Sequence, residues 1–191
     1  MAAPFDPLRH SLSSSIDKNR YFEDFREDEQ FPLPSRTITD AHFSAFQAVT
    51  GDNHPIHYDR EYCKRHGHPN LLAHGLHVAA LLTPGAGLFP HLVEESLVGF
   101  LEQSTRFLKP LYSGDTVYPM LVVSGLKPQR TTGVLTLTAS IHNQRRELIL
   151  DGAFLTVKAA LPHLKASGAG AIVTGGSRGH ERRRSVGPRR R

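Results

Sequence analysis

Asp52 and His57 lie five residues apart and are the residues of this chain best suited to acid–base chemistry. Pro55 lies between them and disfavours a helical conformation at His54, so this stretch predicts a bent loop. Such a loop can turn both side chains toward one pocket, where a carboxylate and an imidazole supply one group that takes a proton and one that gives it. The residues alone also allow an ordinary turn with a surface histidine, and they do not show which group is the acid and which the base.

The run from Thr50 to Asp59, T-G-D-N-H-P-I-H-Y-D, resembles the hydratase-2 motif of the MaoC-like dehydratases, whose usual form is Ser/Thr-Gly-Asp-x-Asn-Pro-Ile/Leu/Val-His. His54 stands where the motif has asparagine, while Asp52 and His57 keep the two catalytic positions. The resemblance implies an R-specific hydro-lyase that reversibly adds water to a 2-enoyl-CoA or related acyl thioester and gives a 3-hydroxyacyl thioester. It implies no cofactor, because coenzyme A is part of the substrate.

A second stretch, from Leu71 to Thr83, carries small or apolar residues at nearly every position. It predicts a helix that begins near Gly75 and is buried on all sides. The His74-Gly75 step matches an H-G pair of the same family, which implies that the Gly75 N–H meets the oxyanion on the thioester carbonyl. Thr83 matches a hydroxyl position near the catalytic water of related hydratases, although a simple helix C-terminus explains it equally well.

The segment from Arg106 to Val117, R-F-L-K-P-L-Y-S-G-D-T-V, also resembles the family, which shares an F-x-x-P-x-x-x-G-D pattern. Phe107 is expected to be structural. Arg106 and Lys109 are candidates for contact with the phosphates of coenzyme A, because fixed cations at a pocket mouth favour a polyanionic carrier. The alternative is a solvated strand end.

The remaining pattern predicts the elements that position these residues. Asp40 is expected to cap a helix from Ala41 to Val49 that ends at Gly51, and Asp59 to Lys64 suits a short helix. Four strands joined by hairpins are expected at Ser96–Phe107, Thr116–Val123, Thr132–His142 and Glu147–Val157. The absence of helices between successive strands argues against a Rossmann fold and predicts an α+β class. The resemblance implies the same class, as a hot-dog fold in which a curved antiparallel sheet wraps a central apolar helix.

Composition limits the remaining possibilities. The chain of 191 residues favours one domain with tails, and its single cysteine, Cys63, excludes an intrachain disulfide and a zinc site built on paired cysteines. We therefore expect a cytoplasmic protein. We expect no metal site, because the histidines of the central region lack the spacing of an H-E-x-x-H site. These histidines are His54, His57, His66, His68, His74 and His77.

The two ends differ from the middle. Residues 1–20 predict a flexible lead-in, 21–160 the folded domain, and 161–191 a Gly/Arg-rich tail without the large apolar side chains that ordering requires. Seven arginines between Arg178 and Arg191 account for the formal net charge of +5. A basic run without an aromatic platform makes a nucleic-acid partner unlikely, and no apolar run is long enough for a membrane span.

A single sheet on one helix leaves edge strands uncovered, so we expect a homodimer or a higher homo-oligomer that extends the sheet.

Two other functions compete with the hydratase. One is a hot-dog protein that only binds acyl thioesters. The other is a thioesterase, which usually places an acidic residue on or near the central helix, whereas Leu76 to Leu82 contains none.

Overall fold

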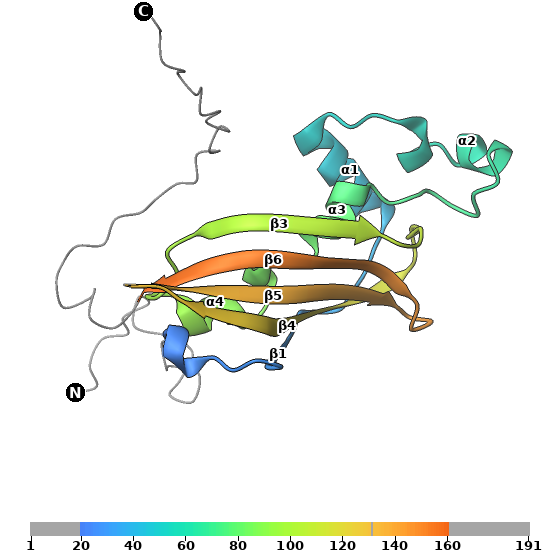
Figure 1. The fold of residues 1–191 in the computed structure, drawn as a ribbon. Coiled ribbons are helices and arrows are strands. Elements are labelled where there is room, and N and C mark those ends of the chain that lie inside the picture. Colours follow the sequence, from blue (N-terminus) through green and yellow to red (C-terminus); the bar gives the residue numbers. More distant parts are fainter. Residues whose placement is uncertain (1–19, 131, 161–191) are drawn as a thin grey trace, which may run out of the picture.

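A computed structural model of the chain describes residues 20–130 and 132–160. Of the predicted lead-in it describes only Arg20, and the predicted basic tail lies outside the described residues. One antiparallel sheet dominates the described part, with its strands in the order β1-β4-β5-β6-β3 and β2 beside β4 (Figure 1). The strands are β1 (Gln30–Pro32), β2 (Arg36–Thr37), β3 (Phe100–Phe107), β4 (Thr116–Pro128), β5 (Thr132–Asn143) and β6 (Leu148–Ala160). This arrangement confirms the predicted α+β class.

The four long strands form where the sequence predicts them, but one of the predicted hairpins is wrong. β4, β5 and β6 follow one another as a meander, whereas β3 pairs with β6, with Phe107 opposite Leu150. The turn before β4 bonds instead to distant segments, because Gly114 N–H donates to the Ile38 carbonyl (2.7 Å) and Ser113 N–H to the Leu71 carbonyl (2.9 Å). The turn residues therefore predicted the bend before β4 correctly. They did not predict the partner of β3, which long-range pairing determines.

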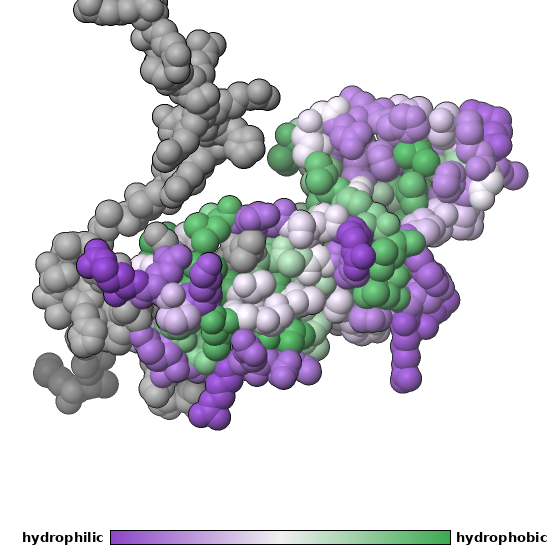
Figure 2. All heavy atoms as spheres, viewed as in Figure 1, coloured by the Kyte–Doolittle hydropathy of each residue, from purple (hydrophilic) through white to green (hydrophobic). Residues whose placement is uncertain are grey.

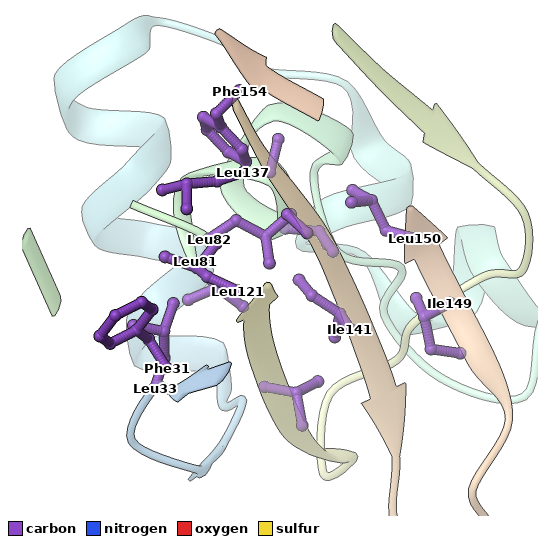
Figure 3. Packing of buried hydrophobic residues seen from close by; sticks show 14 of the residues in the cluster. Phe31, Leu33, Leu81, Leu82, Leu121, Leu137, Ile141, Ile149, Leu150 and Phe154 are labelled. Atoms are coloured by element: carbon purple, nitrogen blue, oxygen red, sulfur yellow. The ribbon is translucent and has the colours of Figure 1, made fainter. Parts of the chain in front are cut away.

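Alternating side chains of the long strands form the core. Along β5, Leu135, Leu137 and Ile141 are fully buried, as the two-residue period of a strand requires. Leu82 packs against them from the segment after α3 (Gly75–Ala80), as Figure 3 shows. Burying each such side chain stabilises the fold by roughly 1.5–3 kcal/mol. β3 differs, because its residues are exposed or half-buried along its whole length.

Short helices carry the segments between β2 and β3. They are α1 (Asp40–Thr50), η2 (Pro55–His57), α2 (Arg60–Arg65), α3, η3 (Pro84–Ala86) and α4 (Phe89–Val93), and η1 (Phe22–Asp24) precedes β1. In Figure 1, α1 and α2 stand beyond one end of the sheet on its β3 side, whereas α4 lies behind the sheet. Within the described residues, no helix combines the length and the apolar character needed to cross a bilayer.

The predicted helix ends are largely confirmed. Gly51 ends α1 with a left-handed backbone (φ 73°), and Asp59 caps α2 by accepting a hydrogen bond from Tyr62 N–H (2.9 Å). The prediction for Asp40 is wrong by one residue. Thr39 takes the N-cap position and its N–H donates to His42 Nδ1 (3.0 Å), whereas Asp40 opens the helix and accepts a bond from the Ser113 hydroxyl (2.5 Å).

The helix after His74 begins at Gly75 as predicted, but it is not buried on all sides. His77, Val78 and Ala79 are buried, whereas Gly75 and Ala80 are exposed and Leu76 is 71% exposed. The helix has only six residues, and its buried His77 packs against Phe43 and Phe46 of α1, whereas Leu76 stays exposed. An apolar face without a cover thus remains beside the residues singled out for chemistry.

Candidate active site

The loop that carries Asp52 is fixed by its own sequence. The Thr50 hydroxyl donates to the Phe46 carbonyl (2.8 Å) at the end of α1 and accepts a bond from Asp52 N–H (3.3 Å). Gly51 supplies the left-handed turn between them, and the Gln47 amide donates to the side chain of Asn53. Asp52 therefore leaves the helix in a defined direction with its side chain exposed.

His57 ends the short turn that Pro55 begins. His54 keeps an extended backbone (φ −69°, ψ 132°), as the proline after it requires. The ring of His57 is buried, and its Nδ1 lies 2.7 Å from the Leu72 carbonyl oxygen. Because a carbonyl only accepts hydrogen bonds, Nδ1 carries the proton and Nε2 carries the lone pair.

His74 joins this pair, although the sequence analysis gave it no catalytic role and considered it only as the residue before Gly75 and as one of the histidines rejected as metal ligands. Its ring stacks on that of His57 with centroids 3.7 Å apart and planes 21° apart, and its Nε2 lies 3.2 Å from the Asp52 carbonyl oxygen. Burial lowers the pKa of His74, and the neighbouring His57 lowers it further. His74 is therefore neutral at neutral pH. The H-G pair was the only signal in the sequence, and it did not show where the ring would point.

Asp52, His57 and His74 bring a carboxylate oxygen and two ring nitrogens within 4.8 Å of one another, a grouping that invites comparison with a metal site. The ring geometry is unfavourable for one. Lone pairs lie in the ring plane, so two nearly parallel rings direct them side by side, whereas a zinc ion needs nitrogens that converge on it at about 2.0–2.1 Å. The cluster suits proton transfer better.

A pocket of about 400 Å³ opens beside His57. Gly75 and Lys109 are its other lining residues of chemical interest, and apolar side chains form most of the rest: Leu72, Ala73, Val78, Phe107, Leu108, Pro110, Leu111 and Ile149. A Cβ atom at Gly75 would lie 3.3 Å from the ring of Phe107, so a glycine lets that ring lie directly against the first turn of α3. The pocket thus combines an imidazole, an exposed backbone at a helix start and a cation in apolar surroundings.

Comparison with known proteins identifies the family of this chain. A family model described as a MaoC like domain matches residues 24–144. The chain belongs to the MaoC-like family. A 3-hydroxybutyryl-CoA dehydratase of Methylorubrum extorquens is 31% identical over 135 residues, which cover 71% of this chain and 82% of the relative. An (R)-specific enoyl-CoA hydratase of Rhodospirillum rubrum is 26% identical over 139 residues, 69% of this chain and 87% of the relative.

The solved structures confirm the hot-dog fold. A conserved hypothetical protein from Mycobacterium tuberculosis, described as having a double hot-dog fold, superposes with a TM-score of 0.63 at 24% identity. The match covers 75% of this chain and 45% of that one. The MaoC-like chain described here thus corresponds to about half of the double-fold protein.

Three other predicted site residues of this MaoC-like chain lie at different places. Thr83 donates its hydroxyl to the Ala80 carbonyl (2.6 Å) and lines a separate hollow of about 420 Å³. Arg106 is exposed and pairs with Asp151 through two hydrogen bonds (2.9 and 2.5 Å). Lys109 lines the same pocket as His57 and Gly75, whereas Thr83, Arg106 and Asp52 are not among the lining residues of that pocket.

Lys109 also takes part in an ion pair at the pocket edge. Its Nζ lies 3.0 Å from a Glu147 carboxylate oxygen. Hydrogen bonds from Asn143, Lys109 and Arg145 lower the pKa of Glu147 to about 2, so the carboxylate is ionised at neutral pH. The Lys109 side chain is about half exposed and that of Glu147 about one-third exposed, so water reaches this pair and weakens it.

Proposed function

We propose that this protein is a hydro-lyase that reversibly hydrates a 2-enoyl thioester, such as a 2-enoyl-CoA, to a 3-hydroxyacyl thioester. The observation that carries the proposal is that the Asp52 carboxylate lies within 4.8 Å of a ring nitrogen of the buried His57, which lines a pocket together with Gly75. The dehydratase and hydratase named among its relatives support the same class of reaction.

The geometry supports a mechanism with one bound water. The unprotonated Nε2 of His57 accepts a proton from a water that the Asp52 carboxylate also holds, and the water oxygen bonds to C3 of the enoyl group. The imidazolium then returns the proton to C2, so the net change is the addition of H and OH. The Gly75 N–H binds the thioester oxygen, where negative charge develops between these two steps.

A protein that binds acyl thioesters without turning them over is the main alternative, and a thioesterase is a weaker one. The arrangement of His57 favours catalysis over mere binding, because its Nδ1–H bond to Leu72 fixes the tautomer in which Nε2 is a base. Within the described residues, α3 carries no carboxylate of the kind that thioesterases usually place there. Hydration is thus the reaction that these groups support best.

The direct test follows the absorbance of the enoyl-thioester band with a panel of CoA substrates. We expect Asp52→Asn and His57→Ala each to lower turnover by at least about a hundredfold, the scale of a general acid or base. His66→Ala is the matched control, because His66 also places its Nδ1 against a backbone carbonyl (2.8 Å, Tyr62) but lies exposed at the C-terminal end of α2. Near wild-type turnover in both dyad variants would refute the assignment.

We also propose that the active form is a homodimer built along β3. Phe100, Leu101 and Phe107 of this edge strand are each about half exposed, and its outer backbone edge has no neighbour among the described strands. Such an edge pairs readily with another strand. Figure 2 shows apolar residues reaching the surface on this side of the sheet, and the match to half of a double hot-dog protein supports a second copy here.

A further inference from the structure

We propose that His74 is a positioning residue for the hydration reaction, one that fixes the Asp52 loop and the His57 ring in a single relative orientation. This inference rests on the proposed function, since it assigns a role within the same site. It is carried by the contacts that His74 makes to both members of the dyad.

The first contact is to the backbone of Asp52. The Asp52 carbonyl can only accept a hydrogen bond, so Nε2 of His74 carries the proton and donates across 3.2 Å. This bond joins the second residue after α1 to the residue that precedes α3, and these two residues lie 22 positions apart in the sequence. It therefore holds the exposed carboxylate of Asp52 to the buried part of the molecule.

The second contact is to the ring of His57. The stack of the two imidazoles, 3.7 Å apart, restricts the tilt of the His57 ring, and the bond from His57 Nδ1 to the Leu72 carbonyl restricts its rotation. Together these restraints leave one direction for the lone pair on Nε2. Reactions that depend on a near-attack geometry lose about a hundredfold in rate when a group is displaced by about 1 Å, so this restraint has a large effect on turnover.

The surroundings of His74 favour a role in positioning Asp52 and His57 over a role in carrying a proton. Its ring is 1% exposed and packs against Phe43 and Phe46 of α1, with centroids 6.0 and 5.0 Å away. Within the described residues, its Nδ1 is buried without a hydrogen-bond partner. A buried unpaired acceptor is costly, and an apolar side chain would fill this aromatic cluster without that cost. The bond from Nε2 to Asp52 supplies a reason for histidine at this position.

Two variants separate the parts of this role. His74→Phe keeps an aromatic ring against His57 and removes the donor to Asp52, whereas His74→Gln keeps a donor and removes the stack. We expect His74→Phe to lower kcat between about tenfold and a hundredfold with KM changed less than about twofold, because the loss concerns geometry at the reacting atoms. His74→Gln should recover part of that loss.

The matched control is His66→Phe. His66 stacks on Tyr62 at 4.1 Å and 22°, an arrangement like that of His74 on His57, but its ring is exposed and does not contact the dyad. This variant should keep wild-type kcat. A His74→Phe protein that matches wild type and His66→Phe in kcat would overturn the proposal, and so would a loss confined to KM.

An independent measurement does not depend on activity. The ring ¹⁵N chemical shifts of the wild-type protein at neutral pH should show His74 neutral with its proton on Nε2. A proton on Nδ1 would overturn the proposal even if the His74 variants failed to fold. Absence of hydration by the wild-type protein over the whole thioester panel, with the expected His74 shifts, would instead refute the proposed function and leave the contact to Asp52 established.

Discussion

The buried His77 is expected to make the folded protein less stable at mildly acidic pH. Its ring is buried between Phe43 and Phe46 of α1, near His42, and its Nδ1 has no hydrogen-bond partner within the described residues. Burial, followed by the charges of His42, His74 and Arg36, lowers its pKa from the ordinary 6.5 to about 4. We therefore consider how the free energy of unfolding changes when the pH is lowered from 7 to 5.

The sign follows from where the proton binds. Below pH 6.5 the unfolded chain takes up a proton at His77, whereas the folded chain does so only near pH 4, so stability falls as the pH falls through this window. One pKa unit corresponds to about 1.4 kcal/mol. Integrating the difference in proton binding between the unfolded and folded states from pH 7 to pH 5 gives a loss of about 2 kcal/mol in the free energy of unfolding from His77. The loss stops growing below pH 4, where both states are protonated.

The assay is urea unfolding followed by circular dichroism at pH 7 and pH 5, at matched protein concentration because the proposed homodimer would make stability depend on concentration. His77→Phe removes the titrating group and keeps an aromatic side chain, so it should lose about 2 kcal/mol less than wild type between the two pH values. His91→Phe makes the same substitution at an exposed histidine of α4 and should retain the wild-type loss. Equal losses in wild type and His77→Phe would refute the reasoning.

Three further predictions concern the pocket and the edge strand. Gly75→Ala should lower hydration more than tenfold, because its Cβ would lie 3.3 Å from the Phe107 ring, and Phe107→Leu in the same chain should restore part of the rate in the enoyl-thioester assay. Lys109→Ala should raise KM for a CoA thioester but not for a short N-acetylcysteamine thioester. Arg106→Ala should change neither KM by more than about twofold, because Arg106 lies outside the pocket that Lys109 lines. Leu101→Glu should convert a dimer into a monomer in light scattering, since it places a charge on the exposed β3 edge; an unchanged mass would count against β3 as the interface.

Local signals in the sequence predicted the parts of the site that depend on neighbouring residues. Gly51 permits a left-handed backbone, Pro55 excludes a helix at His54, and Asp59 caps the next helix, so the bend that carries Asp52 could be predicted from these few residues. Each of these effects acts within four positions along the chain. Such effects need no knowledge of the rest of the fold.

Other features of the site and of the fold depend on contacts between segments that are far apart in the sequence. Local sequence signals could not predict them. His74 reaches Asp52 and His57 only because α3 packs against α1, and no spacing rule indicates that stack. The position of β3 beside β6 depends on pairing across the whole domain, whereas the turn residues before β4 suggested a hairpin. The length and exposure of α3 likewise depend on what covers it, since its composition alone predicted burial.

The pairing of β3 with β6 also fixes the order in which the protein can become functional. Phe107 and Ile149 face the same pocket from two strands that the entire β4–β5 meander separates along the chain. A nascent chain can form the loop that carries Asp52 and His57 early, but the opposite wall of the pocket is absent until β6 has emerged and docked. Such non-local pairings slow folding, because the entropy of closing a long loop is lost before the contacts form. A substrate pocket beside the proposed acid–base pair therefore requires the chain to be folded as far as β6.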